Sequence, residues 1–452
     1  MSRGFESHAL RTTTTRQPTT ERNCVSDDLR HHSRRSAKTP GVARHGRLKR
    51  SSATATAFKA LAAAMAVVFV AGLSVVGIAG LSLASAVSPG VTLENEKTLG
   101  AIPQIGAIDG GANVLLVGSD SREGQGDGYG EESGDLNDVT MLLHIAQDHS
   151  SASVISFPRD MFVPIPECPD PNGGTFDAMS SQKINTTLGY GGLACTVLTV
   201  EQLTGLSIPF AAEVQFNGVI AMSDAVGGVP VCVAERIEDD HTDTYLDPGE
   251  HTLSGLAALQ FLRTRHGVGD GSDLTRISNQ QVFLSSLVRT IKSADTLTNP
   301  VKLYSLAKAA LSNMKLSNSL QNMDTMVSIA MALKDIDLNN VVFVQYPTGS
   351  TEGGVEPLEE PAAALNAALL ADQPIALTGD TGGSVADPNA PATEEPAATE
   401  EPEATEEPAA DPEPSTEAPA PTKTPTTKTE LDAKGQTAGQ YTCSSGRTLD
   451  DQ

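Results

Sequence analysis

The amino-acid sequence predicts an α/β fold: a central mixed β-sheet covered by helices on both sides, preceded by one transmembrane helix and followed by a disordered tail. Three observations lead to this prediction. Short apolar segments alternate with amphipathic helical segments over residues 101–377. An uncharged apolar segment at residues 60–87 is long enough to span a bilayer. The last part, residues 381–452, is rich in Pro, Thr and Glu and begins with repeats too polar to form a core.

The N-terminal part predicts a membrane anchor. Residues 1–56 hold 12 Lys and Arg against 4 Asp and Glu and lack apolar periodicity, so we expect a disordered basic cytoplasmic arm. Basic residues flank the apolar segment on its N-terminal side only, which predicts a single pass through the cell membrane with the following domain outside the cell. A cleaved signal peptide, with small residues at Ser82–Ser88, is the alternative. The apolar segment is longer than a typical signal core, which favours the uncleaved anchor.

Charge separates the arm from the rest of the chain. From residue 57 onward there are 19 Lys and Arg against 52 Asp and Glu. Such an acidic domain is not expected to bind nucleic acid. The basic arm is typical of a topology signal with affinity for anionic lipid.

The first strand predicted in the domain lies in the segment Ala112–Arg122. The apolar run Val114–Val117 is typical of a buried strand, and Gly118 ends it. Asp120 and Arg122 follow at the strand end, where open α/β sheets bind their ligands.

A β-hairpin is predicted next. Two apolar stretches, 141–145 and 152–157, are separated by a polar turn. Pro158 stops the second strand because it lacks a backbone N–H. The hairpin begins and ends with charged residues, Asp138, Arg159 and Asp160.

Helices and strands alternate after the hairpin. Ser254 is expected to cap one helix, and Asp273 is expected to open the longest one, with Arg276 and Gln280 on one face. Strands are expected at 212–216, 229–233 and 341–346, and helices at 194–203, 217–226, 255–264, 273–293, 299–314 and 319–334.

Arginines gather in the segment Phe261–Gln281. Arg263, Arg265 and Arg276 lie there among Gly and Asp, and guanidinium groups beside a flexible turn suit phosphate oxygens. A solvated helix end with ordinary ion pairs is the alternative. The acid and arginine residues at the earlier strand ends favour an anion site.

Several short motifs occur in a recognisable order. They are GSDSR at 118–122, DVTML at 138–142, SFPRD at 156–160, KIN at 183–185, RTRH at 263–266 and DLTRISNQ at 273–280. This order resembles that of the LytR-CpsA-Psr family of cell-envelope phosphotransferases, over about residues 112–346. One position departs from the family pattern, since Asn137-Asp138-Val139 stands where the family commonly has Ser-Asp-Thr. The hydroxyl of Thr140 is considered as a replacement for the one that this change displaces.

The resemblance implies the fold and the activity of that family. The expected reaction moves a glycopolymer from a polyprenyl-pyrophosphate carrier onto a cell-wall acceptor hydroxyl and releases polyprenyl phosphate. Peptidoglycan is the expected acceptor, and a wall surface protein is the alternative. Teichoic acid or an arabinogalactan-like polymer is the expected cargo.

Residue roles follow from the matching motifs. The catalytic set is Asp138, Arg159 and Arg265. Pyrophosphate binding is assigned to Arg122, Arg159, Arg263, Arg265 and Arg276. Asp120 and Asp138 are expected to hold Mg²⁺ or Mn²⁺, with Asp138 as base toward the acceptor hydroxyl as the alternative. Asp160 and Asp273 are expected to orient arginines, and His144 and His266 are left out of the catalytic set.

The resemblance also implies an apolar tunnel for the polyprenyl chain. Candidate lining residues lie on the amphipathic helices, where plain core packing is the alternative. They are Leu284, Leu287, Leu306, Leu311, Met326, Ile329 and Leu333.

Four cysteines follow the anchor, an even number that predicts two disulfides. Cys168 and Cys195 flank one loop and are paired. Cys232 with Cys443 then follows by elimination, and this pair forms only if the tail reaches the domain.

Two other functions are compatible with the sequence. The long acidic tail would suit a non-catalytic wall-binding scaffold. The basic arm would suit a transcriptional attenuator, although it has no helix-turn-helix pattern and too little apolar content to fold.

Overall fold

The computed structural model describes residues 52–84, 89–96, 108, 111–122, 134–170, 173–292, 299–388 and 428–452. The chain divides into two compact units, Met1–Ala71 and Gly72–Gln452. The predicted basic arm lies almost wholly outside the described residues.

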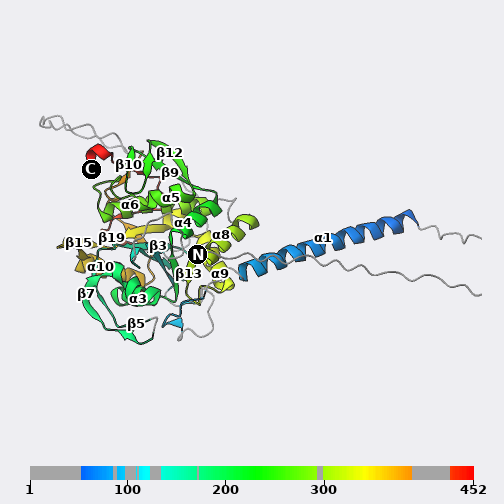
Figure 1. The fold of residues 1–452 in the computed structure, drawn as a ribbon, viewed down its shortest axis with the longest axis horizontal. Helices are drawn as coiled ribbons and strands as arrows, with labels where there is room; N and C mark the ends of the chain where they lie inside the picture. The colour runs from blue at the N-terminus through cyan, green and yellow to red at the C-terminus, as the bar shows by residue number, and fades with distance from the viewer. Residues whose placement is uncertain are drawn as a thin grey trace, which may run out of the picture. The chain divides into compact units, whose positions relative to one another are not determined.

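Helix α1 (Ala53–Ala84) includes most of the predicted anchor (Figure 1). Its segment Ala53–Ser74 has the length and composition of a membrane span, and none of it is buried within the protein. The helix begins before the predicted start at residue 60. The last predicted anchor residues, 85–87, lie outside the described residues.

The domain is built on a seven-stranded mixed sheet in the order β13-β8-β1-β2-β3-β14-β20. Strands β1 and β8 run parallel, as do β3 and β14, whereas the other neighbours are antiparallel. The strands are β1 (Ala112–Ser119), β2 (Asn137–Ile145), β3 (Ala152–Phe157), β8 (Phe210–Val214), β13 (Met314–Leu316), β14 (Val341–Gln345) and β20 (Gly435–Thr437). The predicted mixed sheet and its hairpin are confirmed.

Helices cover both faces of this sheet, as predicted (Figure 1). Apolar residues of α3 and α10 pack on one face, and those of α6, α8 and α9 pack on the other. Helices α4 and α5 form a further core with α6 and strand β9. The helices are α3 (Thr187–Thr204), α4 (Phe216–Val226), α5 (Gly255–Arg263), α6 (Asp273–Lys292), α8 (Pro300–Asn313), α9 (Met323–Asp335) and α10 (Glu359–Leu370), with short 3₁₀ turns at Ile184–Thr186, Leu338–Asn340 and Leu449–Asp451.

Smaller sheets surround the central one. A four-stranded sheet has the order β12-β9-β21-β18, and pairs of strands form β4-β7, β5-β6, β10-β11, β15-β16 and β17-β19. Their bounds are β4 (Phe162–Ile165), β5 (Cys168–Pro169), β6 (Thr175–Phe176), β7 (Met179–Lys183), β9 (Val229–Val233), β10 (Ile237–Asp239), β11 (Thr244–Leu246), β12 (Gly249–Leu253), β15 (Thr348–Thr351), β16 (Gly354–Pro357), β17 (Ile375–Leu377), β18 (Val385–Ala386), β19 (Thr429–Leu431) and β21 (Cys443–Ser444).

The C-terminal segment corrects the predicted domain boundary. The fold does not end at Leu377, and the expected disordered tail 381–452 contains strands β18 to β21. Residues 428–452 return to the domain, where β20 joins the central sheet, β21 pairs with β9 and β19 pairs with β17. Short strands of this kind carry no apolar periodicity, so the sequence pattern did not reveal them. Residues 389–427 lie outside the described part of the chain.

Both predicted disulfides are present, between Cys168 and Cys195 and between Cys232 and Cys443. The second joins β9 to β21, which pair in parallel at these two cysteines. It closes a loop of 211 residues and holds the returning segment on the domain.

Two local predictions differ from the structure. Ser254 makes no side-chain cap for α5; Ser223 of α4 instead accepts a hydrogen bond from the Gly255 N–H, 2.9 Å away. The helix predicted at 194–203 begins earlier, at Thr187, with a kink at Gly191 and Gly192 that masks the apolar periodicity of its first turns.

Removing the Cys232–Cys443 disulfide should destabilise the domain. The Cys443→Ser variant should lower the free energy of unfolding by about 2–4 kcal/mol, because the cross-link restricts the unfolded chain. Denaturant unfolding of the two single variants and of the double variant should give the same loss. Rapid thiol labelling of Cys443 in the folded wild-type protein would contradict the pairing.

Candidate active site

Charged residues from separate segments meet at one edge of the central sheet. Asp120 directly follows β1, Asp138 lies at the start of β2, and Arg159 follows β3. The hairpin register, in which Thr140 faces Phe157, brings Asp138 opposite Arg159 when it is continued past the strand end. The hairpin therefore builds the centre of the site from its own two ends.

Arg159 is surrounded by three carboxylates. Its Nη1 lies 2.6 Å from Asp138 Oδ1, and its Nε lies 3.6 Å from Asp160 Oδ2 and 3.8 Å from Asp273 Oδ1. Burial lowers the pKa of Arg159, but the neighbouring charges, Asp138 first, raise it above its ordinary value. Its guanidinium therefore stays positively charged with only 25% of its side chain exposed.

The first turn of α6 completes this cluster. Arg276 Nη2 lies 2.6 Å from Asp273 Oδ1 and donates to the Asp138 carbonyl oxygen at 2.8 Å. Asp273 Oδ2 also accepts from the Arg159 N–H at 3.2 Å. Arg276 and Asp273 are both buried. The contacts of Asp273 therefore hold Arg159 and Arg276 in fixed positions. Asp273 orients both, as the sequence predicted.

Lys183 and Asp160 form the outer side of the cluster, with Lys183 Nζ 2.8 Å from Asp160 Oδ1. Burial raises the pKa of Asp160, but the Lys183 hydrogen bond and the charges of Arg159 and Arg265 bring it below its ordinary value. Arg265 lies in the loop after α5. Its Nε donates to the Gly271 carbonyl oxygen at 2.8 Å, which orients the side chain within its Gly-rich turn.

Arg263 and Arg122 occupy separate positions. The guanidinium carbon of Arg263 lies 4.6 Å from the centre of the Phe216 ring, a cation–π contact at the start of α4. Arg122 is half-buried beyond the end of β1, next to residues 123–133, which lie outside the described part of the chain.

The carboxylates of Asp120 and Asp138 suit a divalent cation. Burial raises the pKa of Asp120, and the negative charges of Asp138 and Asp135 raise it further, although the Leu136 N–H that it accepts at 2.8 Å opposes this. Two carboxylates that repel each other in this way supply the oxygen ligands that Mg²⁺ prefers, and a cation between them would remove the repulsion.

Asn137, at a position where the resembled family commonly has serine, has a structural role. It is fully buried; its amide donates to Thr140 Oγ1 at 2.8 Å and its carbonyl oxygen accepts from Thr187 Oγ1 at 3.2 Å. The Thr140 hydroxyl, considered as a replacement for the displaced one, is thus engaged with Asn137. Together they tie the strand that carries Asp138 to the start of α3.

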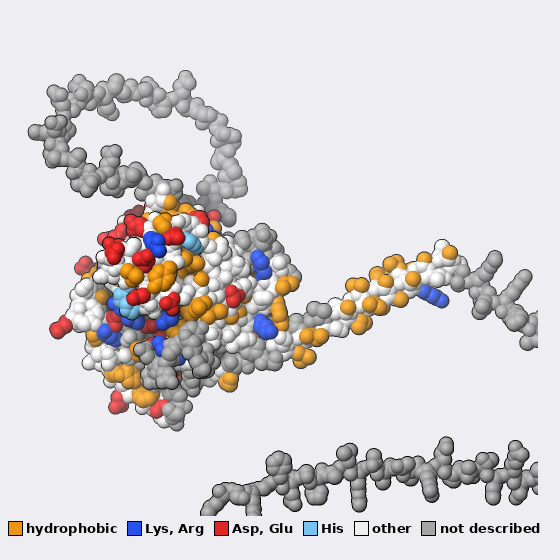
Figure 2. Space-filling view, turned by 45° about the horizontal axis from the view of Figure 1, so that its top comes forward, with side chains coloured by type: hydrophobic (Ala, Val, Ile, Leu, Met, Phe, Trp, Pro, Cys, Tyr) orange, Lys and Arg blue, Asp and Glu red, His pale blue; other side chains and the backbone are white. Residues whose placement is uncertain are grey.

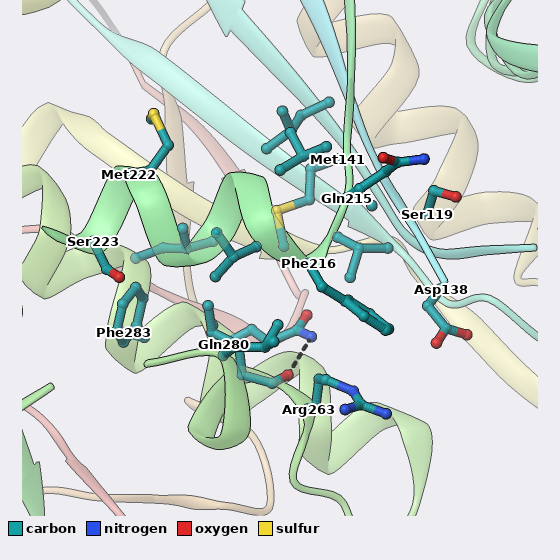
Figure 3. A pocket seen from close by; sticks show the side chains of 18 of the residues that line it. Ser119, Asp138, Met141, Gln215, Phe216, Met222, Ser223, Arg263, Gln280 and Phe283 are labelled. Carbon is teal, nitrogen blue, oxygen red and sulfur yellow. Dashed lines mark hydrogen bonds between the residues drawn. The ribbon is translucent and has the colours of Figure 1, made fainter. Parts of the chain in front are cut away.

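An apolar cavity of about 220 Å³ begins at the charged cluster. Figure 3 shows Asp138, Arg263 and Phe216 toward one end and Met222, Ser223 and Phe283 toward the other. Gln280 lines it and donates to the Leu262 carbonyl oxygen at 3.0 Å. Most other lining residues are hydrophobic, among them Leu116, Met141, Val214, Val219, Leu259, Leu284, Leu287 and Met314.

Two of the seven residues predicted to line a tunnel line this cavity. Leu284 and Leu287 on α6 face the cavity. The other five candidates do not line this cavity and pack in the cores beside the sheet, namely Leu306, Leu311, Met326, Ile329 and Leu333. Their helical spacing fits a core as well as it fits a tunnel, which is why the pattern did not separate the two.

Sequence reasoning missed Lys183 and Phe216 as site residues. Lys183 belongs to the KIN motif, and nothing in the sequence pattern indicates its pairing with Asp160. The sequence predicts that Phe216 ends a strand. Phe216 instead starts α4, and its ring makes the cation–π contact with Arg263. His144, left out of the catalytic set, is buried between Asn113 and Asp372, to which its ring nitrogens bond.

Known proteins resemble this chain over its folded domain. A model of the LytR_cpsA_psr family matches residues 87–367. The "Cell wall biosynthesis protein LcpA" of Corynebacterium glutamicum is 32% identical over 273 residues, which cover 55% of this chain and 52% of that protein. The "Polyisoprenyl-teichoic acid--peptidoglycan teichoic acid transferase TagT" of Bacillus subtilis is 27% identical over 244 residues, 52% of this chain and 70% of that protein.

Among solved structures, the "LytR-Csp2A-Psr enzyme from Actinomyces oris" aligns with a TM-score of 0.47 at 21% identity, covering 63% of this chain and 96% of that one. The chain spans about half the length of LcpA. The family match extends over more than half of the chain and contains every charged residue of the site. The chain therefore belongs to the LytR-CpsA-Psr family.

Proposed function

We propose that the protein is a membrane-anchored phosphotransferase that moves a glycopolymer from a polyprenyl-pyrophosphate carrier onto a hydroxyl of the cell wall. The observation that carries this proposal is the continuity of the arginine cluster with an apolar cavity. Asp138, Arg263 and Arg276 line the same cavity as Met141 and Leu284. A ligand that fits both parts has an anionic head and a long apolar chain.

The arginines would bind the pyrophosphate. Two buried donors, Arg159 Nε and Arg276 Nε, make no hydrogen bond among the described residues, and an unsatisfied buried donor favours an acceptor such as a phosphate oxygen. Arg263 lines the cavity, Arg265 lies in the loop after α5, and Arg122 is the further clamp. Preorganised guanidinium groups stabilise the charge that develops on a leaving phosphate oxygen.

The reaction would take place on the sugar-side phosphorus. The acceptor oxygen forms the new P–O bond, the bond to the bridging oxygen breaks, and polyprenyl phosphate leaves. A Mg²⁺ or Mn²⁺ ion held by Asp120 and Asp138 would neutralise phosphate charge. The Arg159 ion pair engages Asp138 Oδ1, so its other oxygen is the one that would contact a cation or accept the hydroxyl proton.

Membrane attachment would keep the domain near its lipid-linked donor. Helix α1 supplies a candidate span at Ala53–Ser74. A cytoplasmic N-terminus would place the catalytic domain outside the cell, where peptidoglycan is the acceptor and a wall surface protein the alternative. The two disulfides suit that oxidising side. Teichoic acid or an arabinogalactan-like polymer is the proposed cargo.

A direct assay tests this function. The full-length chain in lipid nanodiscs is incubated with a polyprenyl-pyrophosphoryl glycan, Mg²⁺ and peptidoglycan, and released polyprenyl phosphate and glycan joined to the acceptor are quantified. Release coupled to glycan transfer supports the proposal. Binding of peptidoglycan without either product would favour a scaffold.

Replacing Arg159 should abolish most activity. The Arg159→Gln variant should lose at least about 100-fold in kcat/KM, the usual effect of removing one charge-stabilising donor. Arg159→Lys should retain more activity than Arg159→Gln because it keeps the positive charge that the three carboxylates require. Thermal melts show whether each variant folds. Arg236→Ala, at an exposed ion pair with Glu238, is the matched control and should keep full activity. A folded Arg159→Gln variant with wild-type kcat/KM would contradict the assignment.

Activity should depend on a divalent cation in a pH-dependent way. Because the pKa of Asp120 is raised, mainly by burial, this carboxyl takes up a proton at a higher pH than an ordinary aspartate. A cation ligand must be charged, so the Mg²⁺ concentration for half-maximal activity should rise as the pH falls toward this raised pKa. Chelation by EDTA should stop turnover.

The Asp120→Asn variant is the control for this titration. It should need more Mg²⁺ at every pH and lose the pH dependence of that requirement. An identical Mg²⁺ requirement in wild type and variant would exclude Asp120 as a ligand.

The cavity should contribute binding energy for the lipid chain. Leu284→Gln places an amide among hydrophobic side chains, so KM for a long-chain donor should rise roughly tenfold, consistent with the loss of one buried leucine. A geranyl donor that leaves the cavity partly empty should show a smaller change, and Leu284→Met should behave as wild type. An equal rise in KM for long and short donors would mean that the chain does not reach Leu284.

A further inference from the structure

Three side chains of types that can ligate a metal ion cluster outside the proposed pyrophosphate site. Asp239 ends strand β10, His241 lies in the turn before β11, and His266 follows Arg265 in the loop after α5. One ligand atom from each of the three lies within 4.8 Å of the others. The two imidazole rings are 4.3 Å apart between centroids.

The Asp239 carboxylate is fixed in one orientation. Its side chain is fully buried. Its Oδ2 accepts hydrogen bonds from one hydroxyl and three backbone N–H groups, those of Thr264 at 2.7 Å, Arg265 at 3.0 Å, His266 at 3.1 Å and Gly267 at 3.4 Å. Because the loop engages Oδ2 through these four hydrogen bonds, Oδ1 is directed toward the two imidazoles.

The free side of this carboxylate faces the histidines. Asp239 Oδ1 accepts a hydrogen bond from the backbone N–H of His241 at 3.0 Å, and it lies 3.6 Å from His241 Nδ1 and 4.0 Å from His266 Nδ1.

We propose that Asp239, His241 and His266 form a binding site for a transition-metal ion of the Zn²⁺ type. Two imidazole nitrogens and one carboxylate oxygen are ligands that Zn²⁺ prefers, whereas Mg²⁺ prefers oxygen alone. This donor set differs from the two carboxylates Asp120 and Asp138, so the two sites take different ions.

The geometry needs only small side-chain movements to close around an ion. Ligands about 2.0–2.2 Å from a tetrahedral Zn²⁺ lie roughly 3.4 Å apart, slightly closer than these atoms are. The His241 and His266 side chains are 65% and 43% exposed, so both can rotate toward Asp239. Asp240 Oδ1, 2.9 Å from His241 Nδ1, would exchange this contact for the ion or become its fourth ligand.

An ion at this site would join the β10–β11 turn to the loop that carries Arg265. The same carboxylate that would ligate the ion already accepts the Arg265 backbone N–H. Figure 2 shows a face of the domain on which His side chains lie among Lys, Arg, Asp and Glu. Binding itself does not depend on the proposed transferase activity and is measured separately.

The test is metal titration of the full-length protein in nanodiscs, without a histidine tag. Zn²⁺ binding is followed by calorimetry, and Co²⁺ is used as a spectroscopic substitute whose visible absorption reports imidazole ligands. The N-terminal arm contains four further histidines, His8, His31, His32 and His45, whose imidazoles are also metal ligands by type, so the readout is the difference between variants. His241→Ala and His266→Ala are compared with His251→Ala, a histidine on β12 outside the cluster.

We expect the wild type and His251→Ala to bind one more equivalent of Zn²⁺ than His241→Ala and His266→Ala. Where weak binding persists in a cluster variant, its affinity for that equivalent should fall at least about tenfold. The Co²⁺ absorption of this site should disappear in both cluster variants. Equal Zn²⁺ stoichiometry and unchanged Co²⁺ spectra in all four proteins would overturn the proposal and leave Asp239 as a loop cap only.

Discussion

The ion pairs around Arg159 hold the separate parts of the site in place. A charge with only 25% of its side chain exposed is costly unless carboxylates surround it. Asp138, Asp160 and Asp273 meet this requirement from the start of β2, the end of β3 and the start of α6. Loss of one partner would leave its neighbours unbalanced. The hairpin and α6 are therefore fixed relative to each other by charge as well as by packing.

The charge balance of this cluster explains what it can bind. Asp138, Asp160 and Asp273 pair with Arg159, Arg276 and Lys183. The Asp120 carboxyl stands against two further arginines, Arg263 and Arg265, within a chain whose net charge is −25. An anion is thus attracted to this edge of the sheet and repelled from most of the surrounding surface. The cavity beside it favours an apolar chain. A lipid-linked pyrophosphate combines both properties in one molecule.

The sequence predicted the parts of the site that depend on local chain geometry. Asp138 and Arg159 were placed at the two ends of one hairpin, and antiparallel register brings such positions together. Contacts between distant segments could not be predicted from the sequence. Arg276 donates to the carbonyl oxygen of Asp138, 138 residues earlier in the chain. Phe216 contacts Arg263 because α4 starts one residue earlier than predicted. The pairing of Cys232 with Cys443 was correct by elimination. The fold of residues 428–452 was missed because its strands are only two or three residues long and carry no apolar periodicity.

The central claim is that the arginine cluster and the apolar cavity form one site for a lipid-linked pyrophosphate. A crystal structure of the protein with a polyprenyl pyrophosphate and Mg²⁺ tests this most directly. The account predicts phosphate oxygens within hydrogen-bond distance of Arg159, Arg263 and Arg276, and the prenyl chain between Met141 and Leu284. A pyrophosphate bound at another surface, or a chain directed into solvent with the cavity empty, would contradict it.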